Sequence, residues 1–217
     1  ELDRKRFDAF VGYTRSPLVQ YFAEELKWYS NEEETIIGVL LIDLCDNNYS
    51  CVILGRDEGG RFRAFKNCTD IQTENEAEEW IKRVIKWHAG LDAKIFPQGD
   101  SLNKGIDLFQ PIVSYEKQHP YFVRLNSDSS FLSAKQLINE IMPHFMDIDG
   151  NYVEQFQTTG FDSRLWELFL FSYLTENEFS INRDYSAPDY FIEKFGKQVA
   201  LEAVIVGRRD NNPPSFL

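Results

Sequence analysis

The sequence predicts an α/β fold of the α+β kind, with an antiparallel meander and helices first and a helix followed by a β-hairpin last. Three observations support this. Apolar runs alternate with turn sequences between residues 36 and 66, and two later segments begin with the Ser/Thr-x-x-Glu/Gln pattern of a capped helix. Near the end, an apolar stretch precedes two short apolar runs that flank a glycine turn. At 217 residues the chain can form one large or two small domains.

The N-terminal part begins with a predicted helix after Ser16-Pro17, because proline is favoured in the first helical turn. Its expected buried stripe comprises Leu18, Phe22, Leu26 and Tyr29. Strands are then predicted at residues 36–44, 49–54 and 61–66, separated by Asp/Asn-rich and Gly-rich turns. Together these strands indicate an antiparallel meander.

Two further helices are predicted from their ends. Thr73 and Glu76 form a capping box, and Gly90 marks the end of that helix. Residues 91–121 contain several prolines and glycines and predict a linker, with a short strand at residues 122–125. Ser133 and Gln136 form a second capping box, for a helix that Pro143 bends or ends. We therefore expect a recognition or regulatory domain over residues 1–120 and a second domain over residues 121–217.

The helix expected over residues 163–176, with Asp162 as its cap, is apolar on nearly every side. Glu167 is the only charged residue between positions 165 and 174. No basic residue lies three or four positions after Glu167, but Arg164 lies three positions before it and can form an ion pair. Such a pair would give Glu167 a purely structural role.

The hairpin that follows contains two more carboxylates in apolar surroundings. Pro188 introduces Asp189 and a strand over residues 189–193, and a second strand is expected over residues 198–206. Because both faces of the second strand are apolar apart from Glu202, we expect a central strand that is covered on both sides. A lone buried carboxylate costs several kcal/mol unless it is paired or bound to metal. The sequence therefore predicts that Glu167, Asp189 and Glu202 share a divalent cation.

These residues resemble the active-site motif of the PD-(D/E)XK nuclease superfamily, which has a restriction-endonuclease-like fold. The matching positions are Glu167 on a helix, Pro188-Asp189 on a strand and Glu202-Ala203-Val204 on its neighbour. The resemblance covers about residues 162–206. It implies a metal-dependent nuclease that hydrolyses phosphodiester bonds, with DNA as the expected substrate and bacterial defence or DNA processing as the associated role.

The resemblance also implies roles for the matching residues. Asp189, Glu202 and the backbone carbonyl of Ala203 would hold Mg²⁺ or Mn²⁺. Glu167 would hold a metal-bound water or contribute to a second metal. All three carboxylates are thus expected to be catalytic.

The sequence departs from the family pattern in two places. The motif lysine is replaced by Val204; basic residues nearby in sequence are Lys194, Lys197, Arg208 and Arg209, none at the motif position. A full core also needs another helix and strand after Glu202, so we expect the core to be truncated at the C-terminus or completed in another way. Two alternatives stay open: a catalytically inactive nuclease-fold module that binds nucleic acid or protein, and an α/β protein with an unrelated role.

Composition restricts the partners and the location. The net charge of −12 disfavours nucleic-acid binding over the whole surface, although a local basic groove or a metal would permit contact. No apolar run approaches the roughly 20 residues that span a bilayer, so no membrane partner is expected. Three cysteines without CxxC spacing indicate reduced thiols and a cytoplasmic protein. A homodimer or a protein partner bound by the N-terminal domain stays open.

Overall fold

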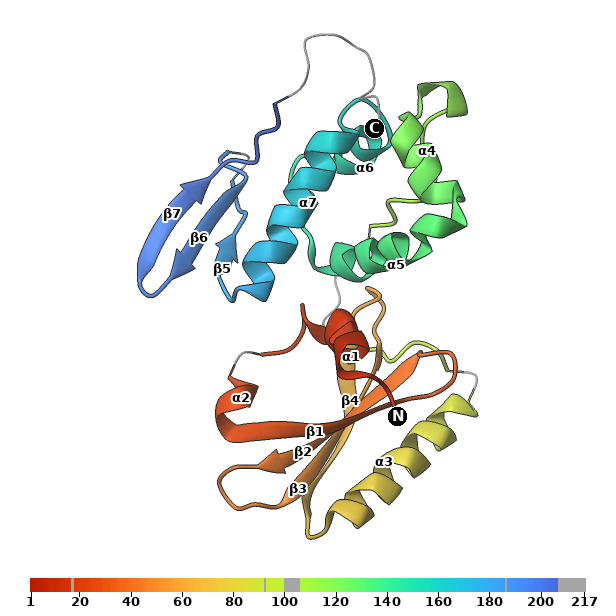
Figure 1. Ribbon diagram of the computed structural model, residues 1–217, viewed down its shortest axis with the longest axis vertical. Helices are drawn as coiled ribbons and strands as arrows, with labels where there is room; N and C mark the ends of the chain where they lie inside the picture. The colour runs from red at the N-terminus through yellow and green to blue at the C-terminus, as the bar shows by residue number, and fades with distance from the viewer. Residues whose placement is uncertain (17, 92, 100–105, 186, 207–217) are drawn as a thin grey trace. The chain divides into compact units, whose positions relative to one another are not determined.

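The computed structural model describes residues 1–16, 18–91, 93–99, 106–185 and 187–206 (Figure 1). The chain forms two compact units. Unit 1 consists of Glu1–Asp107 and Leu132–His144, and unit 2 of Leu108–Phe131 and Phe145–Leu217. The boundary expected at residue 120 falls at the first residue of a helix in unit 2. Helices and antiparallel sheets occur together, which confirms the α+β class.

Unit 1 is built on a four-stranded antiparallel sheet. Its strands, hydrogen-bonded in chain order, are β1 (Ala23–Ser30), β2 (Ile36–Asp43), β3 (Tyr49–Arg56) and β4 (Phe62–Ile71). Its helices are α1 (Arg4–Val11), α2 (Val19–Phe22), α3 (Glu74–Ala89) and α5 (Leu132–Ile141), with a 3-10 turn at Met142–His144. The three predicted strands are confirmed as β2, β3 and β4.

The apolar sequence of β2 is explained by helices on both faces of the sheet, because alternate side chains point to opposite sides. Leu40 packs in one core with Ile81 of α3, and Ile37 packs in the other with Phe7 of α1. On the α3 side, a Cβ at Gly38 would lie 2.9 Å from Cδ1 of Ile81. Glycine therefore allows α3 to approach the sheet closely.

The ends of α3 are as predicted. The side chain of Thr73 accepts a hydrogen bond from the backbone N–H of Glu76, and Gly90 is the C-cap. By contrast, the capping box at Ser133 is wrong, because α5 already begins at Leu132 and Ser133 lies inside it.

The helix predicted after Ser16 is wrong beyond Phe22, and Pro17 lies outside the described residues. Leu26 and Tyr29 belong to β1, which pairs with β2. Apolar residues three or four apart suit a helix, but hydrogen bonds to β2 outweigh that local pattern. The register shift between Glu25 and Lys27 shows that β1 is irregular, which hides its alternation.

Unit 2 combines helices with a three-stranded antiparallel sheet in the order β5-β6-β7. Its helices are α4 (Pro120–Ser127), α6 (Tyr152–Gln157) and α7 (Phe161–Glu176), with 3-10 turns at Tyr115–Lys117 and Ser129–Phe131. Its strands are β5 (Ser180–Asn182), β6 (Tyr190–Lys194) and β7 (Lys197–Leu201). In Figure 1, α7 runs beside this sheet, and it contacts β5.

Two local predictions in unit 2 need correction. Residues 122–125 lie in α4 rather than in a strand, because Pro120 occupies the first helical turn, where it favours helix. The long helix is confirmed as α7, but it begins at Phe161 after Gly160, so Asp162 lies in its first turn and is not its cap.

The predicted central position of the second hairpin strand is also wrong. Among the described strands, β7 pairs only with β6, so it is an edge strand, and it ends at Leu201. Val199 is 55% exposed and Val204 is 76% exposed, and Glu202 is exposed beyond the strand. Apolar residues on both faces indicate a central strand only where further layers cover them, and none does so within the described part of unit 2.

Candidate functional site: acids of α7 and the β6–β7 hairpin

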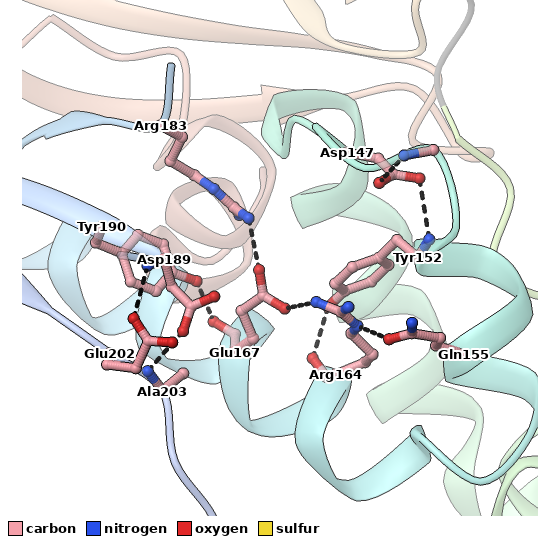
Figure 2. A network of polar contacts seen from close by, with 11 residues as sticks. Asp147, Tyr152, Gln155, Arg164, Glu167, Arg183, Asp189, Tyr190, Glu202 and Ala203 are labelled. Atoms are coloured by element: carbon pink, nitrogen blue, oxygen red, sulfur yellow. Dashed lines mark hydrogen bonds and ion pairs between the residues drawn. The ribbon is translucent and has the colours of Figure 1, made fainter. Parts of the chain in front are cut away.

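Glu167 is held by two arginines inside unit 2. Its side chain is buried, with the residue 3% exposed. Nη1 of Arg164 donates to Oε2 at 2.6 Å, and Nη2 of Arg183 donates to Oε1 at 2.5 Å (Figure 2). The Arg164–Glu167 pair suggested by their spacing is therefore present. The second arginine occupies the other carboxylate oxygen.

Aromatic rings enclose Arg183. Its side chain is only 10% exposed, and its guanidinium carbon lies 4.0 Å from the ring centroid of Phe145 and 4.9 Å from that of Tyr190. Such contacts between a cation and an aromatic face are favourable, more so when desolvated. The Tyr190 hydroxyl donates to the backbone carbonyl of Glu167 at 2.6 Å. Burial raises the pKa of Tyr190, so this donor stays protonated.

Arg164 is fixed from the other side. Its Nε donates to Oε1 of Gln155 at 2.6 Å, and its backbone carbonyl accepts from the Tyr152 hydroxyl at 2.5 Å. Burial lowers the pKa of Arg164, but the hydrogen bond and the charge of Glu167 outweigh burial, so the pKa is raised overall. Arg164 is therefore a stable cationic partner of Glu167.

Asp189 and Glu202 meet at the open end of the β6–β7 hairpin, next to the registered pair Tyr190 and Leu201. The backbone N–H of Asp189 donates to Oε2 of Glu202 at 3.3 Å. In return, the backbone N–H of Ala203 donates to Oδ2 of Asp189 at 2.7 Å (Figure 2). These reciprocal bonds bring together the three residues expected to bind metal.

Glu167 and Asp189 also line one small pocket, together with Arg164, Arg183 and neighbouring residues of unit 2. Its free volume is about 20 Å³, which is room for about one water molecule. Asp147, which also lines it, closes a turn: its carboxylate accepts from the N–H groups of Gly150 and Tyr152.

The donor set can be tested against a divalent cation. Within the described residues, no group of three or more His, Cys, Asp or Glu side chains could hold a metal ion. Mg²⁺, however, is commonly bound through one or two carboxylates while it keeps several waters and takes oxygens from substrate phosphates. Asp189 and Glu202 supply two adjacent carboxylates, and no ion-pair partner in the described part of the chain neutralises either. The pair fits Mg²⁺ bound in this way.

Val204 stands at the position of the motif lysine. It lies past the end of β7, and its apolar side chain is exposed. Lys194 is engaged elsewhere: its Nζ donates to the carbonyl of Asn177 at 2.6 Å. Arg208 and Arg209 lie outside the described residues. The cations that line the pocket with Asp189 are instead Arg164 and Arg183.

The sequence reasoning missed Arg183 as a partner of Glu167. The two residues are 16 positions apart, so no helical or strand spacing links them. A signal was nevertheless present, because Arg183 is the only basic residue in the polar connection from 175 to 187. A buried carboxylate that needs a cation favours such an isolated arginine.

No protein-family model, curated protein or solved structure matches this chain. Among the described residues, no helix has both the length and the apolar character needed to cross a membrane.

Proposed function

We propose that this chain is a metal-dependent nuclease that hydrolyses phosphodiester bonds, with DNA as its substrate. The observation that carries the proposal is the reciprocal hydrogen bonding between Asp189 and the Glu202-Ala203 segment. It places together two carboxylates that have no ion-pair partner among the residues that the structure describes. The resemblance to the PD-(D/E)XK motif, with a helix before the hairpin, supports the same conclusion. A cytoplasmic role in bacterial defence or DNA processing belongs to this proposal.

Asp189, Glu202 and the carbonyl of Ala203 would hold Mg²⁺ or Mn²⁺ in this activity. When bound, the ion lowers the pKa of a water molecule and neutralises charge on the phosphate and the leaving oxygen. The carboxylates orient that ion at the exposed end of the hairpin, where a polymer has access. Bound metal also reduces the repulsion between a phosphate backbone and a chain of net charge −12.

Glu167 takes a different role from the one its position in the motif implies. Both of its carboxylate oxygens accept hydrogen bonds from arginines, so it does not act as a base in this arrangement. Instead, it holds Arg164 and Arg183 in place at the small pocket that Asp189 also lines. These two guanidinium groups bring positive charge to the pocket that Asp189 also lines, where the motif lysine is absent.

A second candidate is a catalytically inactive nuclease-fold module that binds nucleic acid or protein. The engagement of Glu167 with two arginines favours it, as does Val204 at the lysine position. This module would bind DNA without cleaving it, and binding would not depend on the hairpin carboxylates.

The deciding experiment combines metal binding with cleavage. Purified protein is titrated with Mn²⁺ by calorimetry and incubated with plasmid and single-stranded DNA in Mg²⁺ or Mn²⁺. We expect cleavage and Mn²⁺ binding to be lost in Asp189→Asn and in Glu202→Gln. Glu193→Gln, which changes an exposed carboxylate on the same hairpin, is the matched control and should retain both.

The outcomes separate the two candidates. Equal cleavage by wild type and all variants would indicate a contaminating nuclease and refute the proposal. Absence of cleavage, with DNA binding that resists EDTA and is unchanged in both variants, would establish the inactive module instead.

A further inference from the structure

Two of the three cysteines face each other across neighbouring strands of unit 1. Cys51 of β3 and Cys68 of β4 are partners in the antiparallel register, and both are free thiols. Directly opposite residues in antiparallel strands point to the same face, with Cα atoms about 4.5–5.5 Å apart. A disulfide requires a Cα separation of roughly 4.4–6.8 Å. The register therefore places this pair within bridging range.

We propose that Cys51 and Cys68 form a reversible thiol-oxidation site, which a small disulfide such as glutathione disulfide converts to an intramolecular disulfide. The third cysteine, Cys45, is exposed, follows β2 and is not part of this pair. The inference concerns unit 1 and is independent of the nuclease proposal.

The two thiols differ in access, which sets the order of reaction. Cys68 is partly exposed, whereas Cys51 is fully buried and its Sγ lies 3.4 Å from the carbonyl oxygen of Ala77 in α3. Burial raises the pKa of Cys51 to about 12, and the nearby charge of Cys68 adds to this effect. Because the thiolate is the nucleophile, Cys68 attacks the oxidant first.

The chemistry balances in two exchange steps. The Cys68 thiolate attacks one sulfur of glutathione disulfide, which forms a mixed disulfide and releases one glutathione thiolate. Cys51 then loses its proton and attacks Sγ of Cys68, which closes the protein disulfide and releases the second glutathione. The protein pair loses two electrons, and the oxidant gains them. The high pKa of Cys51 makes the second step the slower one.

The local backbone allows the small approach that a bond requires. Cβ atoms of opposite residues lie about 4.5–5.5 Å apart, against roughly 3.5–4.5 Å in a disulfide. The register of β3 and β4 shifts between Tyr49 and Cys51, directly beside the pair, and Asp70 has a φ of 60°. Such a bulge interrupts the hydrogen-bond ladder, so the strands can adjust there without moving the whole sheet.

Oxidation would also change the contact between the sheet and α3. The Cys51 thiol proton faces the carbonyl of Ala77, and a disulfide sulfur has no proton to donate. A covalent link between β3 and β4 would thus replace a contact between β3 and α3. The packing of α3 then depends on the thiol redox state.

The test incubates the native full chain with glutathione disulfide, blocks free thiols at intervals and maps peptides without reduction. We expect first a glutathionyl adduct on Cys68 and then a peptide that links Cys51 to Cys68, both reversed by dithiothreitol. In a denaturing concentration of urea, the Cys51–Cys68 disulfide should no longer be favoured over disulfides that include Cys45. A native product that links Cys45 to another cysteine, or a Cys68 adduct that never resolves, would overturn the proposal.

Three variants extend the test. Cys45→Ser should form the bridge at the wild-type rate, because this exposed thiol is not involved. Cys68→Ser should neither bridge nor react at Cys51. In Cys51→Ala, the reaction should stop at the mixed disulfide between Cys68 and glutathione. If this mixed disulfide lasted as long in wild type, Cys51 would not be the thiol that displaces glutathione. The wild-type peptide map decides the question even if a variant fails to fold.

Discussion

Replacement of Glu167 by glutamine should strongly destabilise unit 2. Glutamine keeps the size and one acceptor oxygen but removes the charge, so two arginines with side-chain exposures of 19% and 10% lose their shared anion. Removal of one member of a buried ion pair costs about 3–5 kcal/mol, because it leaves an uncompensated buried charge. Replacement of all three residues by apolar ones of similar volume, with Arg164→Leu, Glu167→Met and Arg183→Met together, should be nearly neutral.

Native-state hydrogen exchange followed by mass spectrometry is the suitable assay, because it measures α7 and β6 separately from unit 1. A loss of about 3 kcal/mol corresponds to amide exchange that is more than about a hundredfold faster in these elements. Arg124→Met is the matched control: its ion pair with Asp128 is surface-exposed, and we expect no measurable change. If Glu167→Gln exchanged as slowly as wild type, the buried counterion account would be refuted.

Three further predictions follow from the described contacts. The pKa of His144 is lowered to about 4 by burial and then by the charge of Arg61, so below about pH 6.5 the unfolded chain binds a proton that the folded one does not. The free energy of unfolding of unit 1 should therefore fall by up to about 3 kcal/mol as the pH is lowered from 6.5 to 4. In urea titrations, His144→Gln should show a weaker dependence of this free energy on pH. Gly38→Ala should lower the free energy of unfolding by about 1–3 kcal/mol, because the added methyl group overpacks the core. Adding Ile81→Val should restore part of this free energy, because it removes the Cδ1 atom that the new methyl group would contact. Gln157→Met should speed exchange of the Ile112 amide, since the buried amide of Gln157 accepts from that N–H and donates to the carbonyls of Leu108 and Gln110; unchanged exchange would contradict it.

Local signals were sufficient where they agreed with the tertiary structure. The α3 helix followed from Thr73, Glu76 and Gly90, and the strands β2 to β4 followed from apolar runs between turns. The residues from Leu26 to Tyr29 were misread because their spacing suits a helix, while their strand conformation depends on pairing with β2. Non-local hydrogen bonds of this kind leave little trace in the sequence.

The site shows a similar division. The juxtaposition of Asp189 and Glu202 was expected, because an antiparallel hairpin brings its two ends together. The exposure of Glu202 was not expected, since the apolar residues around it suggested a covered strand. The alternation of side chains identifies which residues share a face, but only the neighbouring elements decide whether that face is buried.

The three acids differ in what their replacement should affect, which is protein stability for Glu167 and cation affinity for Asp189 and Glu202. Glu167 is buried and neutralised by two arginines, so its replacement acts first on the stability of unit 2. Asp189 and Glu202 lie at a hairpin end without ion pairs in the described chain, so their replacement should barely affect stability and should act on cation affinity. Loss of cleavage in Glu167→Gln would therefore be ambiguous unless unit 2 were shown to be folded, whereas the same loss in a stable Asp189→Asn protein would locate the chemistry at the hairpin.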